Sequence, residues 1–190
     1  MSPASPVPPD PRVPPGSVVL ITGVMAAGKS TVAEALATRL PRAAHVRGDA
    51  FRRMIVSGRE ELMPEETEEA RAQLRLRYRL AAAAADLYAE AGFTAVVQDI
   101  VLGEDLAAFP ALVRARPFHV VVLAPGPGTV APREEARAKD GYGPWTVAAL
   151  DASLREATPR LGLWLDTSRQ TPDQTVDALL AGLDAARVEG

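Results

Sequence analysis

The sequence predicts an α/β domain in which a five-stranded, mostly parallel sheet is covered by helices on both faces. Three observations predict this class. Apolar, strand-like runs alternate with helical patterns from residue 17 onward. The 190 residues are enough for one such domain with a substantial core, but too few for two domains of ordinary size. The first apolar run also leads directly into a glycine-rich, phosphate-binding pattern.

The phosphate-binding pattern G-x-x-x-x-G-K-[ST] runs from Gly23 to Ser30 without a mismatch, between a strand-like run and a helical pattern. Glycines at both ends let backbone N–H groups turn inward around a phosphate. Lys29 is expected to reach the β- and γ-phosphates, and the Ser30 hydroxyl to bind Mg²⁺. A glycine-rich turn without a ligand is the disfavoured alternative. The expected nucleotide-binding residues here are Gly23, Ala26, Ala27, Gly28, Lys29, Ser30 and Thr31.

Residues 1–16 are expected to form a disordered or polyproline-like tail, and residues 17–190 a single domain. A segment that binds a proline-recognising partner is the alternative reading of the tail. Its prolines are Pro3, Pro6, Pro8, Pro9, Pro11, Pro14 and Pro15.

Composition excludes several classes of protein. The net charge of -3 argues against a nucleic acid as the main ligand. The absence of cysteine excludes disulfides, thiolate metal sites and cysteine nucleophiles. No apolar run approaches the roughly 20 residues that span a bilayer, and the N-terminus lacks the order of a secretory signal. We therefore expect a cytoplasmic protein that does not enter a membrane; the sequence carries no signal for its oligomeric state.

Asp49 is the candidate catalytic base. A helix over residues 30–40 ends at Pro41, and a short strand over 43–47 leads into Asp49. In open α/β sheets, ligands bind at the carboxyl ends of the strands, which is where this residue lies. A carboxylate there can accept the proton of a hydroxyl that attacks the γ-phosphate. The alternative is that Asp49 only caps a helix.

A long helix is predicted over residues 64–91, because glutamates occupy its start and Gly92 follows its end. Residues 74–80 alternate apolar and basic side chains as a strand would, but no turn signal separates them from their flanks. Arg71, Arg75 and Arg79 would line one helix face, as an anchor for an acidic substrate or as a solvated surface.

Asp99 ends the next buried strand, predicted over residues 93–100. An acidic residue at this place could bind Mg²⁺ or hold a substrate hydroxyl, and the sequence does not separate these roles. A helix over 104–114 and a strand over 118–123 follow. His45 and His119 lie within predicted strands and are expected to be packed residues, not catalytic bases.

A small lid is predicted over residues 125–145, where glycine and proline punctuate both ends of a short charged helix. Arg133 and Arg137 are one helical turn apart, so their guanidinium groups could stack on the base and stabilise the transferring phosphoryl group. A solvated helix is the alternative. A helix over 145–157, a strand over 161–166 and a capped C-terminal helix from Thr171 complete the chain.

Together these segments resemble small P-loop kinases of the group that contains chloramphenicol phosphotransferase, gluconate kinase, shikimate kinase and adenylylsulfate kinase. The likeness rests on residues 23–31, Gly48-Asp49, residues 99–103 and the segment from Arg133. It implies a three-layer P-loop kinase fold with a small helical lid, and ATP and Mg²⁺ as cofactors. It also implies that Asp49, Lys29 and Arg137 are catalytic, that Arg133 contacts the nucleotide, and that Thr167 lies near the adenine.

Residues 49–52 also fit the D-x-x-R pattern of polynucleotide kinases and zeta-type toxins, in which the arginine contacts a substrate phosphate. Phe51 and Arg52 are therefore candidate substrate-binding residues beside Asp49 and Asp99. We expect an ATP-dependent kinase that phosphorylates a hydroxyl of a small molecule, such as an antibiotic or another secondary metabolite. A kinase of 5′-hydroxyl nucleic acids or sugar nucleotides, and a non-catalytic nucleotide-dependent switch, are the alternatives.

Overall fold

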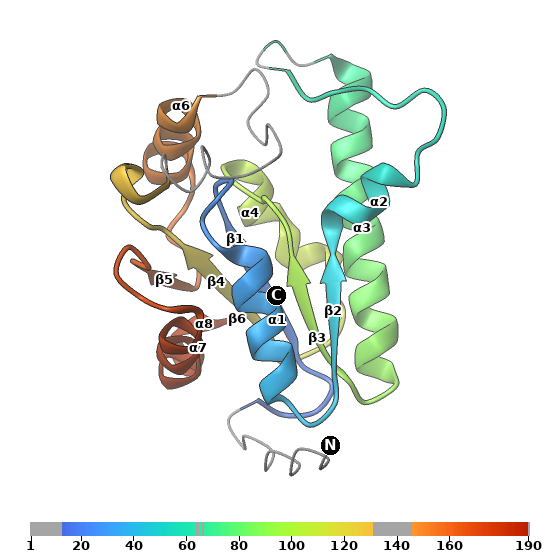
Figure 1. Ribbon diagram of the computed structural model, residues 1–190. Helices are drawn as coiled ribbons and strands as arrows, with labels where there is room; N and C mark the ends of the chain where they lie inside the picture. Colours follow the sequence, from blue (N-terminus) through green and yellow to red (C-terminus); the bar gives the residue numbers. More distant parts are fainter. Residues whose placement is uncertain (1–12, 64, 66, 131–145, 190) are drawn as a thin grey trace, which may run out of the picture.

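The computed structural model describes residues 13–63, 65, 67–130 and 146–189. Its centre is a sheet in the order β2-β3-β1-β4-β5, in which every neighbouring pair is parallel (Figure 1). A sixth strand pairs with β4 in the antiparallel direction and was not predicted. The strands are β1 (Val18–Gly23), β2 (Ala43–Arg47), β3 (Thr94–Gln98), β4 (Phe118–Leu123), β5 (Leu163–Leu165) and β6 (Arg187–Val188).

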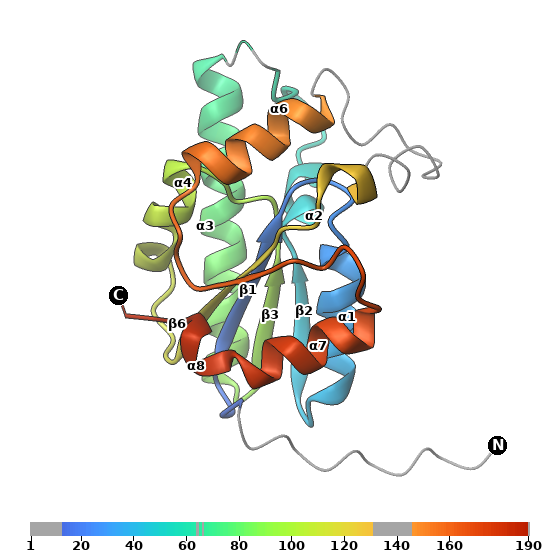
Figure 2. The same ribbon diagram turned by 90° about the vertical axis from the view of Figure 1, so that its left-hand side faces the viewer.

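Helices cover both faces of the sheet, which confirms the predicted three-layer α/β class. Figure 2 shows α1 (Lys29–Arg39) and α7 (Pro172–Ala181) on one face, and α3 (Glu68–Glu90) and α4 (Glu104–Ala108) on the other. The shorter elements are α2 (Gly48–Arg53), η1 (Phe109–Leu112), α6 (Val147–Ala152), the π-helical turn η2 (Ser153–Ala157) and α8 (Leu183–Ala186). Among the described helices, none is long and apolar enough to cross a membrane.

The core lies against β1 and β4, which are buried along their whole lengths. Because both faces of these central strands are covered, their sequences are mostly apolar and do not alternate with polar residues. Thr22 in β1 and His119 in β4 are the buried polar exceptions. Val13 is also buried in this core, although we expected it in the tail, so the packed domain begins before residue 17. Residues 1–12 lie outside the described part of the chain.

Two predicted helices differ in length from the observed ones. The long helix α3 begins at Glu68, not at residue 64, because Thr67 caps it by accepting a hydrogen bond from the backbone N–H of Ala70. The helix predicted over 104–114 stops at Ala108 and continues as the short 3₁₀ turn η1, which contains Pro110. Proline lacks the N–H that an α-helix needs at this position.

Asp86 fastens the far end of α3 to the segment before β4. Its carboxylate is buried and accepts hydrogen bonds from the backbone N–H groups of Arg114 (3.0 Å) and Ala115 (2.9 Å). It also pairs with Arg114 Nε at 3.1 Å. Arg114 makes a second ion pair with Glu90, whose side chain is 61% exposed. The same arginine thus has one buried and one exposed acidic partner.

We expect Asp86→Ala to lower the free energy of unfolding by about 2–3 kcal/mol, because two backbone N–H groups lose their buried acceptor. Glu90→Ala is the matched control, and its effect should stay within about 0.5 kcal/mol, since it removes only an exposed ion pair. Urea denaturation of both variants measures the difference. Equal effects of the two substitutions would contradict the anchoring role of Asp86.

Candidate active site

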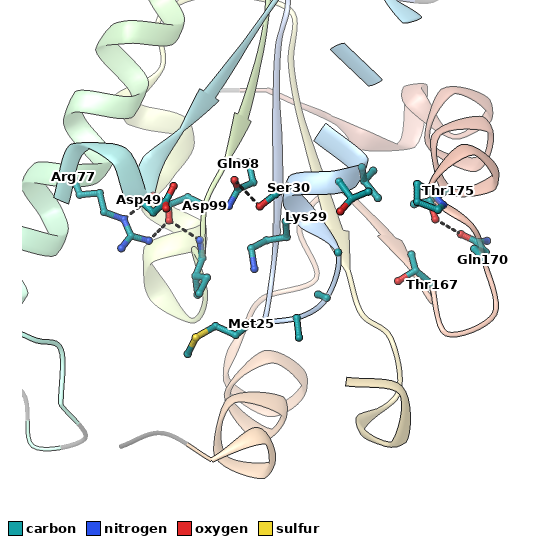
Figure 3. Close-up of a pocket in the computed structure, with 17 residues that line it drawn as sticks. Met25, Lys29, Ser30, Asp49, Arg77, Gln98, Asp99, Thr167, Gln170 and Thr175 are labelled. Carbon is teal, nitrogen blue, oxygen red and sulfur yellow. Dashed lines mark hydrogen bonds and ion pairs between the residues drawn. The ribbon is translucent and has the colours of Figure 1, made fainter. Parts of the chain in front are cut away.

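A cavity of about 630 Å³ opens at the carboxyl edge of the sheet (Figure 3). The loop after β1 and the start of α1 supply residues 25–32 of its wall, and the end of β3 supplies residues 98–100. Asp49 from α2 and Arg77 from α3 complete one side. Thr167, Gln170 and Thr175, from the region before and within α7, lie on the other side of Lys29.

The backbone of the glycine-rich loop adopts left-handed conformations that turn it around the cavity. Gly28 has φ 93° and directly precedes α1, and Ala26 has φ 57°. Gly23 has φ 141°, and a Cβ there would lie 2.3 Å from the carbonyl oxygen of Leu123, so only glycine fits. The predicted nucleotide-binding residues from Ala26 to Thr31 all line the cavity, whereas Gly23 supports the loop from behind.

Lys29 and Ser30 are held at the start of α1 by hydrogen bonds within the site. Lys29 is buried, and its Nζ donates to the carbonyl oxygen of Val24 at 2.6 Å. Ser30 Oγ donates to the side-chain oxygen Oε1 of Gln98, the last residue of β3, at 3.1 Å. The positive end of the α1 dipole faces the same space. This arrangement suits a bound polyphosphate.

Asp99 is occupied by an ion pair with Arg77. Arg77 Nε donates to Asp99 Oδ2 at 2.8 Å and Arg77 Nη2 donates to Oδ1, which also accepts from the backbone N–H of Ile100 at 2.7 Å. The side chains are 14% and 2% exposed. Burial lowers the pKa of Arg77, but the charge of Asp99 and its hydrogen bonds more than offset this, so the pKa is raised.

This pair changes our interpretation of Asp99. The sequence suggested that Asp99 binds Mg²⁺ or a substrate hydroxyl, yet both of its oxygens already accept hydrogen bonds. The strand-end residue that contacts Ser30 is Gln98 instead. Breaking a buried ion pair by removing one partner costs about 3–5 kcal/mol, so Asp99 is held firmly by Arg77.

Three further contacts fix the loop that carries Asp99. The hydroxyl of Tyr78, the neighbour of Arg77 on α3, donates to the carbonyl oxygen of Ile100 at 2.8 Å, and burial raises its pKa. Thr22 Oγ1 donates to the carbonyl oxygen of Val101 and accepts from its N–H, both at 2.9 Å. A Cβ on Gly48 would lie 1.9 Å from Asp99 Oδ2, so the carboxylate packs directly on the backbone between β2 and α2.

Asp49 lies in the first turn of α2 and lines the cavity. Its side chain is 51% exposed and pairs with Arg53, one helical turn later, at 3.0 Å. The N-cap of α2 is Arg47, and Asp49 is inside the helix. The alternative that Asp49 merely caps this helix is therefore wrong.

Two other residues predicted to bind substrate do not line the cavity. Phe51 packs against the hydrophobic core. Arg52 pairs with Glu61 and approaches the carbonyl oxygen of Glu60 at 3.5 Å. Phe51 lies two residues after Asp49 and so on another face of α2. Arg52 lies three residues after Asp49, and its contacts with Glu61 and Glu60 hold it outside the cavity. The D-x-x-R hypothesis thus lacks its substrate-binding arginine within the described residues.

Thr167, which the resemblance implies to lie near the adenine, lines the side of the cavity opposite Asp49. Its side chain is buried, it lines the cavity, and within the described residues its Oγ1 has no hydrogen-bond partner. Gln170 and Thr175 line the same side, with Thr175 Oγ1 donating toward Gln170 Oε1 at 3.1 Å. Nearby, Ser168 Oγ donates to Asp166, which lowers the pKa of that carboxyl.

The remaining candidates lie outside the cavity or outside the described residues. Arg133 and Arg137 fall within 131–145, which the structure does not describe. Arg71 pairs with Asp105, and Arg75 and Arg79 are exposed, as expected for a solvated helix face. His45, which contacts Glu34, and buried His119 do not line the cavity either.

The order of the parallel strands, the glycine-rich loop after β1 and the acidic residue after β2 define the class: this is the fold of P-loop small-molecule kinases. Residues 18–160 match the family model described as AAA domain, and the chain belongs to that family. No curated protein sequence matches the chain.

Solved structures with this fold include kinases of different substrates. A sugar kinase from Janibacter sp. HTCC2649 is 22% identical (TM-score 0.63), with 90% of this chain and 95% of that chain covered. The APS kinase CysC of Mycobacterium tuberculosis, in complex with AMPPNP and APS, is 20% identical (TM-score 0.64; 90% and 99% covered). The tunicamycin resistance protein of Deinococcus radiodurans is 13% identical (TM-score 0.62; 92% and 99% covered).

Gln98 and Arg77 are site residues that sequence reasoning missed. Gln98 directly precedes Asp99, and its place at the end of an apolar strand was the available signal. Arg77 belongs to the run of alternating residues on α3, where nothing in the spacing distinguishes it from Arg75 or Arg79. Only the packing of α3 on β3 turns Arg77 toward Asp99.

We expect Gly48→Ala to displace Asp99, because the new methyl group would overlap its carboxylate. The free energy of unfolding should fall by about 1–3 kcal/mol. Gly128→Ala is the matched control, since a Cβ there would have no neighbour within 4 Å, and its effect should stay within about 0.5 kcal/mol. Thermal and urea unfolding measure both. A Gly48→Ala protein as stable as the control would contradict the close packing of Gly48 on Asp99.

Proposed function

We propose that the protein is an ATP- and Mg²⁺-dependent phosphotransferase that transfers the γ-phosphate to a hydroxyl of a small molecule. One observation carries this proposal: Asp49 lines the same cavity as Lys29 and the phosphate-binding loop. A carboxylate beside the expected position of the γ-phosphate is what a kinase needs, whereas a nucleotide-dependent switch has no use for it.

The transfer step follows from these positions. Lys29 and the loop N–H groups hold the phosphates, and the acceptor binds with its hydroxyl beside Asp49. The hydroxyl oxygen attacks the γ-phosphorus while its proton passes to the Asp49 carboxylate. The bond between the γ-phosphorus and the bridging oxygen breaks, and ADP leaves. Arg133 and Arg137 are proposed to stabilise the charge on the transferring group and to contact the nucleotide.

The residues around Ser30 fit a magnesium ion. Ser30 donates its hydroxyl proton to Gln98 Oε1, so the lone pairs of its oxygen are available to a cation. Ser30 would therefore hold Mg²⁺, with Gln98 orienting it, while Asp99 stays paired with Arg77. When bound, the ion neutralises phosphate charge.

We further propose a secondary metabolite or antibiotic as the acceptor and the cytoplasm as the place of action. The similarity to a tunicamycin resistance protein supports the first point. The cytoplasm is where ATP is plentiful, which supports the second point. Thr167, whose hydroxyl has no hydrogen-bond partner in the part of the chain that the structure describes, is proposed to contact the adenine.

Asp49→Asn tests the catalytic role. The amide cannot accept the proton, so phosphoryl transfer should fall by about 100-fold or more. The affinity for ATP should stay within about twofold, because Asp49 does not hold the phosphates. Transfer of labelled phosphate from ATP to a panel of hydroxylated metabolites, together with calorimetric titration of ATP, measures both. Asp177→Asn on the outer face of α7 is the control. Strong transfer by Asp49→Asn would sink the assignment.

Gln98→Leu tests the orientation of Ser30. Without the acceptor on Gln98 the Ser30 hydroxyl is no longer oriented, so the gain in nucleotide affinity that Mg²⁺ provides should shrink by about tenfold. Binding of ATP in the presence of EDTA should not change, and this is the internal control. Isothermal titration with and without Mg²⁺ measures the effect. An unchanged magnesium dependence would show that Gln98 does not position Ser30.

A further inference from the structure

The half of the cavity that would receive the acceptor holds more acidic than basic side chains among the described residues. In Figure 3, Asp49, Asp99 and Arg77 lie on one side of Lys29, and Thr167, Gln170 and Thr175 on the other. The Asp49 side also includes Met25 and Ile100. Among the described residues that line it, two carboxylates face a single guanidinium group. We call this side the acceptor half.

Arg77 cannot serve as an anchor for an anion. Two of its N–H groups donate to the oxygens of Asp99; the Arg77 side chain is 14% exposed and that of Asp99 is 2% exposed. The carboxylate of Asp99 also packs closely on the backbone of Gly48. An anion that displaced Asp99 from Arg77 would leave Asp99 as an unpaired buried charge, which is strongly unfavourable. An anion that bound Arg77 beside Asp99 would meet a cation whose charge Asp99 already compensates.

The other described arginines near the acceptor half are also paired within the protein. Arg53 pairs with Asp49, Arg52 with Glu61, and Arg71 with Asp105. None of these three lines the cavity. Among the described residues of the acceptor half, an anionic group beside the reacting hydroxyl would therefore lie next to the Asp49 carboxylate and would find no arginine that is not already paired with an acidic side chain.

We infer that the acceptor is a hydroxyl compound with no carboxylate, sulfate or phosphate group next to the hydroxyl that is phosphorylated. The inference rests on the proposed function and narrows its substrate class. The guanidinium of Arg77 has more N–H donors than the two that Asp99 accepts, so the remaining donors suit a neutral hydroxyl or carbonyl oxygen of the acceptor. Met25 and Ile100 offer apolar contact beside them. A neutral compound with polar and apolar faces fits this surface.

Sulfate titration of the nucleotide-loaded protein tests the inference. The full chain is saturated with MgAMPPNP, so that the phosphate-binding loop is filled, and sodium sulfate replaces sodium chloride at constant ionic strength. Calorimetry should detect no sulfate binding in the millimolar range to the wild type. Asp99→Asn removes the negative charge that compensates Arg77, so an uncompensated guanidinium group would lie in the acceptor half. The affinity of this variant for sulfate should rise by about tenfold or more.

Two variants serve as controls. Asp105→Asn removes the acidic partner of Arg71, which lies on the same helix but outside the cavity, and should gain no comparable affinity. Arg77→Gln removes the cation and should bind no sulfate either. The titration of the wild type needs no variant, so it keeps the test decisive even if neither Asp99→Asn nor Arg77→Gln folds.

The outcomes separate the two proposals. Millimolar or tighter sulfate binding by the loaded wild type that Arg77→Gln abolishes would overturn the inference, while phosphoryl transfer could still occur. Failure of MgAMPPNP to bind would overturn the proposed function, and the inference would fall with it. A folded Asp99→Asn protein that gains no sulfate affinity would contradict the inference, because it would show that the ion pair with Asp99 does not prevent Arg77 from binding anions.

Discussion

Arg77 and Asp99 are buried together where α3, the end of β3 and the junction of β2 with α2 meet. A buried pair of this kind is rarely a net source of stability, but the loss of either partner leaves an uncompensated charge at a cost of about 3–5 kcal/mol. The pair therefore acts as a constraint: these elements can pack only in the arrangement that satisfies it. Asp49, directly after Gly48, takes its place at the cavity from this constraint.

The same edge of the sheet is also tied to the phosphate-binding loop. Thr22, near the end of β1, exchanges two hydrogen bonds with Val101, and Ser30 at the start of α1 bonds to Gln98 at the end of β3. The ends of β1, β2 and β3 thus share a continuous set of contacts. A catalytic base and a phosphate-binding loop supplied by different strands can keep a fixed separation only if their strand ends are joined in this way.

Local patterns predicted the sheet, the glycine-rich loop and the position of Asp49 at the carboxyl edge of the sheet. Mostly apolar runs and the spacing of glycine and lysine are features of neighbouring residues in the sequence. The partners of charged groups did not follow from such patterns. Arg77 pairs with Asp99, which lies 22 residues further along the chain, and Arg52 pairs with Glu61. Tertiary packing, and not sequence spacing, decides which side chains of a helix meet such partners. The burial of Val13 likewise depends on the core beneath it, and the two-residue strand β6 is too short to show a period of its own.

The two sides of the cavity are held by different kinds of interaction. The acceptor half depends on a buried ion pair. The chain leaving β4 is held by the packing of Ala124 and Val130 in the core and, between them, by hydrogen bonds from Gly126 N–H to Ser168 Oγ at 2.8 Å and from Arg155 Nη2 to the carbonyl oxygen of Pro125 at 3.1 Å. Such bonds contribute about 1 kcal/mol each. Ser168 directly follows Thr167 and accepts the hydrogen bond from Gly126 N–H, so a displacement of the segment that carries Thr167 and Ser168 would also move Gly126. For the proposed transfer, the acceptor geometry must persist while the nucleotide enters and leaves in every turnover, and the paired charges of the acceptor half suit that requirement.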